Sequence, residues 1–134
     1  MITYHIDPAR RIITTRVSGP LTPANFAGYL AQLFRDPKFD ASFDSLVVAM
    51  DSSAVPPPAT AAIMAPLVRT WSVRRSGCRC AFALPDQEAR QAAELALNEV
   101  RMTAVTTRCF LSEAAASAWL ESTAGAPPAP PIAI

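Results

Sequence analysis

The sequence is poor in several residues that common enzyme chemistries need. Among 134 residues it has four glycines, three cysteines and a single histidine, His5. Four scattered glycines do not make the glycine-rich loop that cradles phosphates, and one histidine leaves little choice of base for a nucleophile. The Gly-x-Ser-x-Gly motif is also missing. We therefore predict a protein that is not an enzyme, with no catalytic residue and no cofactor.

Long apolar runs and an excess of one charge are missing as well. No run reaches the ~20 apolar residues that cross a bilayer, and residues 1–5 lack the basic and apolar regions of a signal peptide. Lys and Arg total 12 against 11 for Asp and Glu, so the chain is far less basic than a typical nucleic-acid binder. We expect a cytoplasmic protein with no membrane span and no nucleic-acid partner.

Apolar residues make up 51% of the chain and charged residues 17%, which is typical of a globular domain. The predicted boundaries are a single domain over residues 1–123 and a Pro/Ala-rich tail over 124–134.

Local signals predict five strands and four helices. Two β-branched runs, 2–6 and 12–17, flank Asp7-Pro8, which favours a type I turn, and so predict a hairpin. Thr22-Pro23 combines a capping hydroxyl with a proline at the first helical position. Further strands are expected at 46–50, 78–84 and 105–111, and further helices at about 59–76, at about 87–101 and after Ser112.

The resulting order is β-β-α-β-α-β-α-β-α. Each strand-helix-strand step requires parallel neighbours, whereas the opening hairpin adds an antiparallel pair. The prediction is therefore an α/β domain with a mixed five-stranded sheet and four helices. Its expected core contains the following residues: Ile13, Val17, Phe26, Leu30, Leu33, Val48, Leu67, Trp71, Phe82, Leu95, Trp119 and Leu120.

Several stretches also carry a family resemblance. They are the hairpin Ile6-Asp7-Pro8 to Val17-Ser18-Gly19, Leu21-Thr22, Asp36-Pro37-Lys38-Phe39, the run Leu46 to Met50, and Ser112-Glu113-Ala114 to Trp119-Leu120. Over about residues 2–121 the chain resembles STAS domains, the sulfate transporter and anti-sigma factor antagonist family, and within it the stand-alone bacterial SpoIIAA-like proteins. The resemblance implies a regulatory protein. In that family a partner kinase phosphorylates a serine in an Asp-Ser-Ser-Gly-Leu stretch that opens the helix after the third strand.

Asp51-Ser52-Ser53 looks like that signature but stands in the wrong place. Three prolines at 56–58 cannot lie in the first turns of a helix, so the helix must begin after them. Aligning strand to strand puts the phosphoacceptor position on Ala59, which has no hydroxyl, with Thr60 beside it. We predict that the phosphorylation switch is absent. Modification of an exposed Ser52 or Ser53 in the loop stays an open alternative.

Strand alternation places Arg16, Arg79 and Arg108 on one side of the sheet together with small residues. One interpretation is an open face for a partner, a second copy of the chain or an anionic ligand. The other is that these arginines only cover the sheet edge with their aliphatic stems.

Three thiols, Cys78, Cys80 and Cys109, lie on two predicted strands. A zinc site needs four ligands, or three and a water, and strand thiols are commonly small buried apolar groups. No metal site is predicted.

The leading functional hypothesis is a non-enzymatic protein-interaction module that acts through Asp51 to Thr60 without phosphorylation. Its expected partners are another protein, such as an anti-sigma-like regulator, and a second copy of itself. The alternative is a carrier of a small ligand, a lipid or a nucleotide, as the resemblance permits, with Met64, Trp71 and Phe110 as candidate lining residues. The third hypothesis is an enzyme that depends on His5.

Overall fold

The structure is a computed structural model and describes residues 1–124. Residues 125–134, and with them nearly all of the predicted tail, lie outside the described residues. The strands are β1 (Ile2–Asp7), β2 (Ile12–Val17), β3 (Asp44–Ala49), β4 (Arg79–Ala83) and β5 (Thr106–Phe110). The helices are α1 (Pro23–Arg35), α2 (Pro58–Arg74), α3 (Gln87–Val100) and α4 (Glu113–Ala124), and Ser52–Ala54 form a single 3-10 turn, η1.

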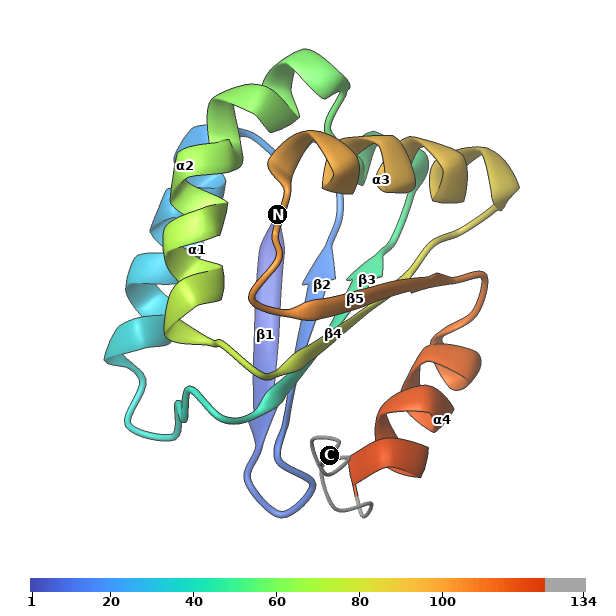
Figure 1. Cartoon of the computed structure of the whole chain (residues 1–134). Helices are drawn as coiled ribbons and strands as arrows, with labels where there is room; N and C mark the ends of the chain where they lie inside the picture. The colour runs from blue at the N-terminus through green and yellow to red at the C-terminus, as the bar shows by residue number, and fades with distance from the viewer. Residues whose placement is uncertain (125–134) are drawn as a thin grey trace, which may run out of the picture.

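The strands lie in the sheet in their order along the chain, β1-β2-β3-β4-β5. The β1–β2 pair is antiparallel and the other three pairs are parallel. The predicted fold class, a mixed five-stranded sheet with four helices, is therefore confirmed (Figure 1).

The helices divide unequally between the two faces of the sheet. Cys80 packs with Leu30 of α1 and Trp71 of α2, whereas Ala81, the next residue of β4, packs with Leu120 of α4. Successive strand residues point to opposite faces, so α4 covers the face opposite to α1 and α2. The third crossover helix, α3, lies with α1 and α2, because its Ala89 and Ala93 pack with Cys109. Figure 1 shows α4 apart from the other three helices.

Local capping bonds explain why the first elements form where the sequence predicts them. The Asp7 carboxylate accepts hydrogen bonds from the backbone N–H groups of Ala9 (3.1 Å) and Arg10 (3.2 Å), which closes the hairpin turn. At the start of α1, the Asn25 N–H donates to the Thr22 hydroxyl at 3.1 Å and the Thr22 N–H donates to the Asn25 side chain at 2.8 Å. This reciprocal pair satisfies two N–H groups that the helix itself leaves without partners.

The prolines delay the start of α2, as predicted, but the helix includes the last of them, because a proline is tolerated at the first helical position. The helix begins at Pro58, and Pro57 is its capping residue with extended backbone. The helix contains Pro66, whose side chain is exposed, and it is followed by Gly77, whose φ of +89° suits glycine.

The predicted core is right for most residues and wrong for one. Ile13, Leu30, Leu33 and Leu120 are among the buried residues. Leu95 is 61% exposed, because α3 buries its alanines instead of its leucine: Ala89, Ala93 and Ala96 face the protein. Alanines allow α3 to approach α2 and the sheet closely, and the larger Leu95 is left on the water side.

Candidate functional site

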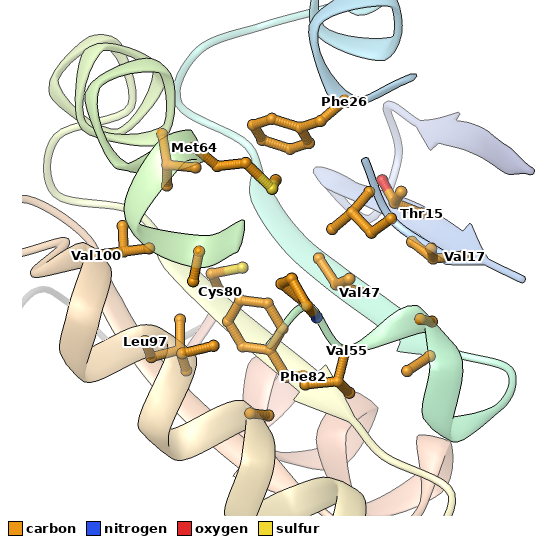
Figure 2. A pocket seen from close by; sticks show the side chains of 18 of the residues that line it. Thr15, Val17, Phe26, Val47, Val55, Met64, Cys80, Phe82, Leu97 and Val100 are labelled. Atoms are coloured by element: carbon orange, nitrogen blue, oxygen red, sulfur yellow. The ribbon is translucent and has the colours of Figure 1, made fainter. Parts of the chain in front are cut away.

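A cavity of about 160 Å³ lies between the sheet and the three helices α1, α2 and α3. Its walls are almost wholly apolar. The side chains that Figure 2 labels come from both layers, with Val17, Val47 and Phe82 on the sheet and Phe26, Met64 and Leu97 on the helices. Protein interiors normally leave few voids larger than a water molecule, so a cavity of this size marks this side of the sheet as the candidate site.

The few polar groups in the wall are largely satisfied and uncharged. The hydroxyls of Thr15 and Tyr29 share a hydrogen bond of 2.7 Å. Burial raises the pKa of Tyr29 to about 12 and that of the Cys80 thiol to about 12. Both groups therefore keep their protons at neutral pH, and neither adds a negative charge to the cavity.

At the end of the cavity where β3 and β4 begin, a buried arginine lies behind the wall. Arg75 is only 1% exposed. Its Nε donates to the carbonyl of Ala41 at 3.1 Å, and its Nη2 donates to the hydroxyl of Ser45 at 3.0 Å and to the carbonyl of Phe43. Its guanidinium carbon lies 5.3 Å from the centre of the Trp71 ring. Ser45 and Trp71 both line the cavity.

Two buried polar atoms at this end have no hydrogen-bond partner. Within the part of the chain that the structure describes, the Nε1 of Trp71 and the Nη1 of Arg75 are the buried side-chain polar atoms in that condition. Burying a donor without a partner costs about 1–3 kcal/mol, so such atoms need a physical explanation.

The predicted lining residues are partly right. Met64 and Trp71 line the cavity. Phe110 does not: it packs against the ring of Trp119 with 5.7 Å between ring centres, on the α4 face of the sheet. The alternation of β5 explains the error, because Cys109 takes the position that faces α3.

The predicted partner loop has a defined structure. Asp51 caps the η1 turn: its carboxylate accepts from the Ser53 N–H at 3.0 Å and from the Gly19 N–H at 3.2 Å. Hydrogen bonds from Ser53 and Gly19 hold the pKa of Asp51 below its usual value. Ser52 and Ser53 are exposed and lie in η1, outside α2.

Ala59 and Thr60 lie in the first turn of α2. Ala59 is exposed and Thr60 is half-buried. The two serines thus form a separate turn before the prolines. The assignment of the family's phosphoacceptor position to Ala59 stays a prediction.

The interpretation of the three arginines as bordering an open face is wrong. Arg16, Arg79 and Arg108 do share one face of the sheet, as the strand register shows. That face is not open, because α4 packs across its centre through Ala116 and Leu120.

Each of these arginines has an interaction of its own. Arg16 holds both carboxylate oxygens of Glu113 on α4, at 3.0 and 2.6 Å, which raises the pKa of Arg16 and lowers that of Glu113. Arg79 lies 4.0 Å from the Asp44 carboxylate. Arg108 lies over the Phe110 ring at 5.4 Å. These contacts fit the second interpretation, in which arginines border a covered face.

The cysteines do not gather into a metal site. Cys78, Cys80 and Cys109 are free and buried, and burial raises the pKa of each thiol. Over residues 1–124, no group of three or more His, Cys, Asp or Glu side chains is placed to hold a metal ion. Nor does any helix in that range combine the length and apolar character of a membrane span.

Sequence reasoning missed Arg75, the residue with the most unusual environment. The sequence did contain a signal. Arg75 follows Met64, Val68 and Trp71 at helical spacing, so it continues the apolar stripe of α2. A charged residue in line with a buried stripe is unusual and marks a candidate site.

Comparison of the chain with protein-family models, with curated proteins and with solved structures gives no match. The resemblance to STAS domains therefore stays a prediction that depends on the local stretches quoted above.

Proposed function

We propose that the protein binds a small apolar ligand in the cavity between the sheet and α1, α2 and α3. The observation that carries the proposal is the volume of about 160 Å³ behind almost wholly apolar walls. In another protein, an engineered apolar cavity of about 150 Å³ binds benzene. The present cavity therefore accommodates a molecule about as large as one aromatic ring.

Energetics support the same proposal. An enclosed cavity lowers stability by about 24 cal/mol per Å³ relative to a filled core, so a volume of 160 Å³ corresponds to at most about 4 kcal/mol. That is a large part of the total stability of an ordinary domain, about 5–15 kcal/mol. A ligand that fills the cavity restores the missing contacts and stabilises the folded state.

Tryptophan fluorescence tests this proposal directly. The chain has two tryptophans, so Trp119→Phe leaves Trp71, in the cavity wall, as the only indole. Titration of this variant with benzene, benzyl alcohol, hexanol and benzoate is expected to change the Trp71 emission and to raise Tm. At a ligand concentration of 100 times Kd, the free energy of unfolding is expected to rise by about 2.7 kcal/mol.

The control for this titration is Val47→Phe. The added ring takes up the cavity space beside Phe82, so the variant is expected to fold and to lose the response. If no compound in the series changes either the emission or Tm of the unfilled protein, ligand binding is excluded for this size class.

The interaction module remains a second candidate, and a surface feature favours it. Met50 is 53% exposed and Leu111 is 47% exposed. Both border a depression of about 240 Å³ at the carboxyl ends of β3, β4 and β5, and Met50 directly precedes Asp51. Exposed apolar side chains around a depression are typical of protein-binding surfaces. In this proposal the loop Asp51–Thr60 and its neighbours bind a regulator or a second copy, without catalysis and without phosphorylation.

Two measurements test the second candidate. Incubation with a bacterial anti-sigma kinase and ATP is expected to leave residues 59 and 60 unlabelled, and stoichiometric labelling there contradicts the missing switch. The mass in solution is compared for the wild type and for Leu111→Asp. A dimer that the substitution converts to a monomer supports self-association through this surface, and an unchanged mass argues against it.

A further inference from the structure

The strongest unexplained feature is the charge of Arg75. An arginine guanidinium stays protonated in proteins, and buried charges are normally paired with an opposite charge. Over the described residues, no carboxylate lies within 4 Å of Arg75. It donates to two carbonyls and one hydroxyl, and it also interacts with the Cys78 thiol, whose pKa burial raises; all of these groups are neutral. The guanidinium is therefore hydrogen-bonded but not neutralised.

The nearby acidic group does not fill that role. Asp40 is close enough for Arg75 to contribute to its lowered pKa, but its first cause is the Ser42 hydroxyl. Asp40 is exposed and accepts from both the backbone N–H and the hydroxyl of Ser42, at 2.8 and 2.7 Å. Its carboxylate stabilises the loop before β3 and does not neutralise the buried guanidinium.

Arg75 does not itself line the cavity but lies directly behind two residues that do. It donates to Ser45 and stacks over Trp71, two residues of the wall. The charge of Arg75 also acts on the side chains of Tyr29 and Cys80, which line the same cavity. Because the thiol and the phenol stay protonated, neither of them supplies an anion to the guanidinium behind the wall.

The two donors without partners, Trp71 Nε1 and Arg75 Nη1, indicate which chemical group of a ligand would bind at this end. Arg75 caps the end of α2, four residues after Trp71, and its guanidinium lies over the Trp71 ring, so the two side chains lie together. The Nε1 of Trp71 has one hydrogen to donate and the Nη1 of Arg75 has two. A carboxylate has two oxygens that accept such bonds and carries the charge that the guanidinium lacks.

We propose that the ligand of this cavity is a small apolar monocarboxylate, with its carboxylate bound by Arg75 Nη1 and Trp71 Nε1 and its apolar body against Val47, Met64 and Phe82. This inference rests on the proposed function, since it names the class of ligand that the cavity takes. The carboxylate lies where β3 and β4 begin, and the body extends toward their carboxyl ends. A body about as large as one aromatic ring matches the volume.

The test compares acids with uncharged molecules of the same shape. Benzoate against benzyl alcohol and hexanoate against hexanol are titrated by calorimetry at pH 7, where both acids are ionised. The wild type is expected to bind each acid about tenfold or more tightly than its alcohol, the effect of one hydrogen bond to a charged group.

Three variants assign that preference to its residues. Arg75→Gln is expected to reduce the acid-to-alcohol ratio to about one while alcohol binding persists. Trp71→Phe keeps a ring in the wall, removes Nε1 and is expected to lower the ratio severalfold. Arg74→Gln, in the exposed neighbour, is the matched loss of charge and is expected to leave the ratio unchanged.

The outcomes separate the two proposals. If neither acids nor alcohols bind, the cavity function itself fails. If both bind equally, or if Trp71→Phe and Arg75→Gln keep the preference, the cavity function stands and the carboxylate inference is overturned. Arg75 also donates hydrogen bonds to the loop before β3. If the loss of these bonds prevents Arg75→Gln from folding, the wild-type acid-to-alcohol ratio and the Trp71→Phe variant still decide whether the carboxylate inference holds.

Discussion

The two faces of the sheet are built from the same strands and are filled in opposite ways. On the α4 side, one helix closes the face: Ala81, Ala116 and Leu120 have no exposed surface and pack with Ile12, Leu46 and Val48. On the other side, three helices meet the sheet through large residues such as Trp71 and Phe82, and a cavity of about 160 Å³ remains. Figure 1 shows α4 lying apart from α1, α2 and α3.

The comparison teaches that a larger apolar surface does not by itself give tighter packing. The one helix of the α4 face settles fully onto Ala81 and its neighbours. Each of α1, α2 and α3 connects two strands, so the three helices cannot all adjust to fill the gap on their side of the sheet. The face with more apolar side chains is therefore the one that has room for a ligand.

The largest predicted effect is the loss of stability when a buried side chain is truncated, and it differs between the two faces. Leu120→Ala is expected to lower the free energy of unfolding by an amount near the top of the range of about 2–5 kcal/mol for buried leucine, because all of its contacts are lost. Met64→Ala is expected near the bottom of that range, because part of the Met64 side chain faces the cavity. Urea unfolding measures both.

The control for truncation is Leu95→Ala, at an exposed position of α3. It is expected to change stability by at most about 0.5 kcal/mol. Equal losses for Leu120→Ala and Met64→Ala would contradict the difference in packing between the faces.

Enlarging two adjacent residues of β4 gives the next largest effect. Cys80 and Ala81 are both buried, but they point to opposite faces. Ala81→Val is expected to cost about 1–3 kcal/mol, since the space under α4 is filled. Cys80→Val adds volume beside the cavity and is expected to cost less than about 1 kcal/mol. Thermal unfolding of both variants checks this order, and the reverse order would show that the cavity lies elsewhere.

The smallest predicted effect is the loss of stability at acidic pH. The Arg16 guanidinium lowers the pKa of Glu113 below its ordinary 4.5, so the ion pair stabilises the folded state above that pH. This contribution is lost as the pH falls through the folded value. The loss is expected to be about 0.2–1 kcal/mol, as for other exposed ion pairs, and it affects the α4 face alone.

Unfolding by urea at pH 6, 4 and 3 measures the acid effect. Glu113→Gln is expected to show a weaker pH dependence than the wild type. Glu99→Gln, an exposed carboxylate on α3, serves as the control and is expected to keep the wild-type dependence. Identical curves for the two variants would mean that the Arg16–Glu113 pair does not stabilise the attachment of α4.

Most of the fold could be predicted because its signals are local. Thr22-Pro23 starts α1 and Asp7-Pro8 closes the hairpin, each through hydrogen bonds within a few residues. The prolines before Ala59 delay α2 through their own backbone restriction. Helices between parallel strands are also constrained to one face by the handedness of the crossover. No such rule applies to α4, because within residues 1–124 no strand follows it.

The candidate site could be predicted only in part. Met64 and Trp71 belong to an apolar stripe that the sequence shows, but the gap that they border depends on how three helices settle on the sheet, which is a property of distant contacts. The assignment of Phe110 failed for a similar reason, since the face of β5 that meets α3 is set by pairing with β4. Arg75 was overlooked because arginine is abundant in this chain and its burial depends on the loop before β3.

The position of α4 after all five strands has a consequence for synthesis. The sheet and its three crossover helices are complete by residue 110, when the last helix has not yet been made. Until residues 113–124 leave the ribosome, the surface formed by Ile12, Leu46 and Val48 is in contact with water. Nascent chains at this stage expose an apolar sheet surface that binds chaperones and favours aggregation. The docking of the twelve-residue helix α4 buries this surface.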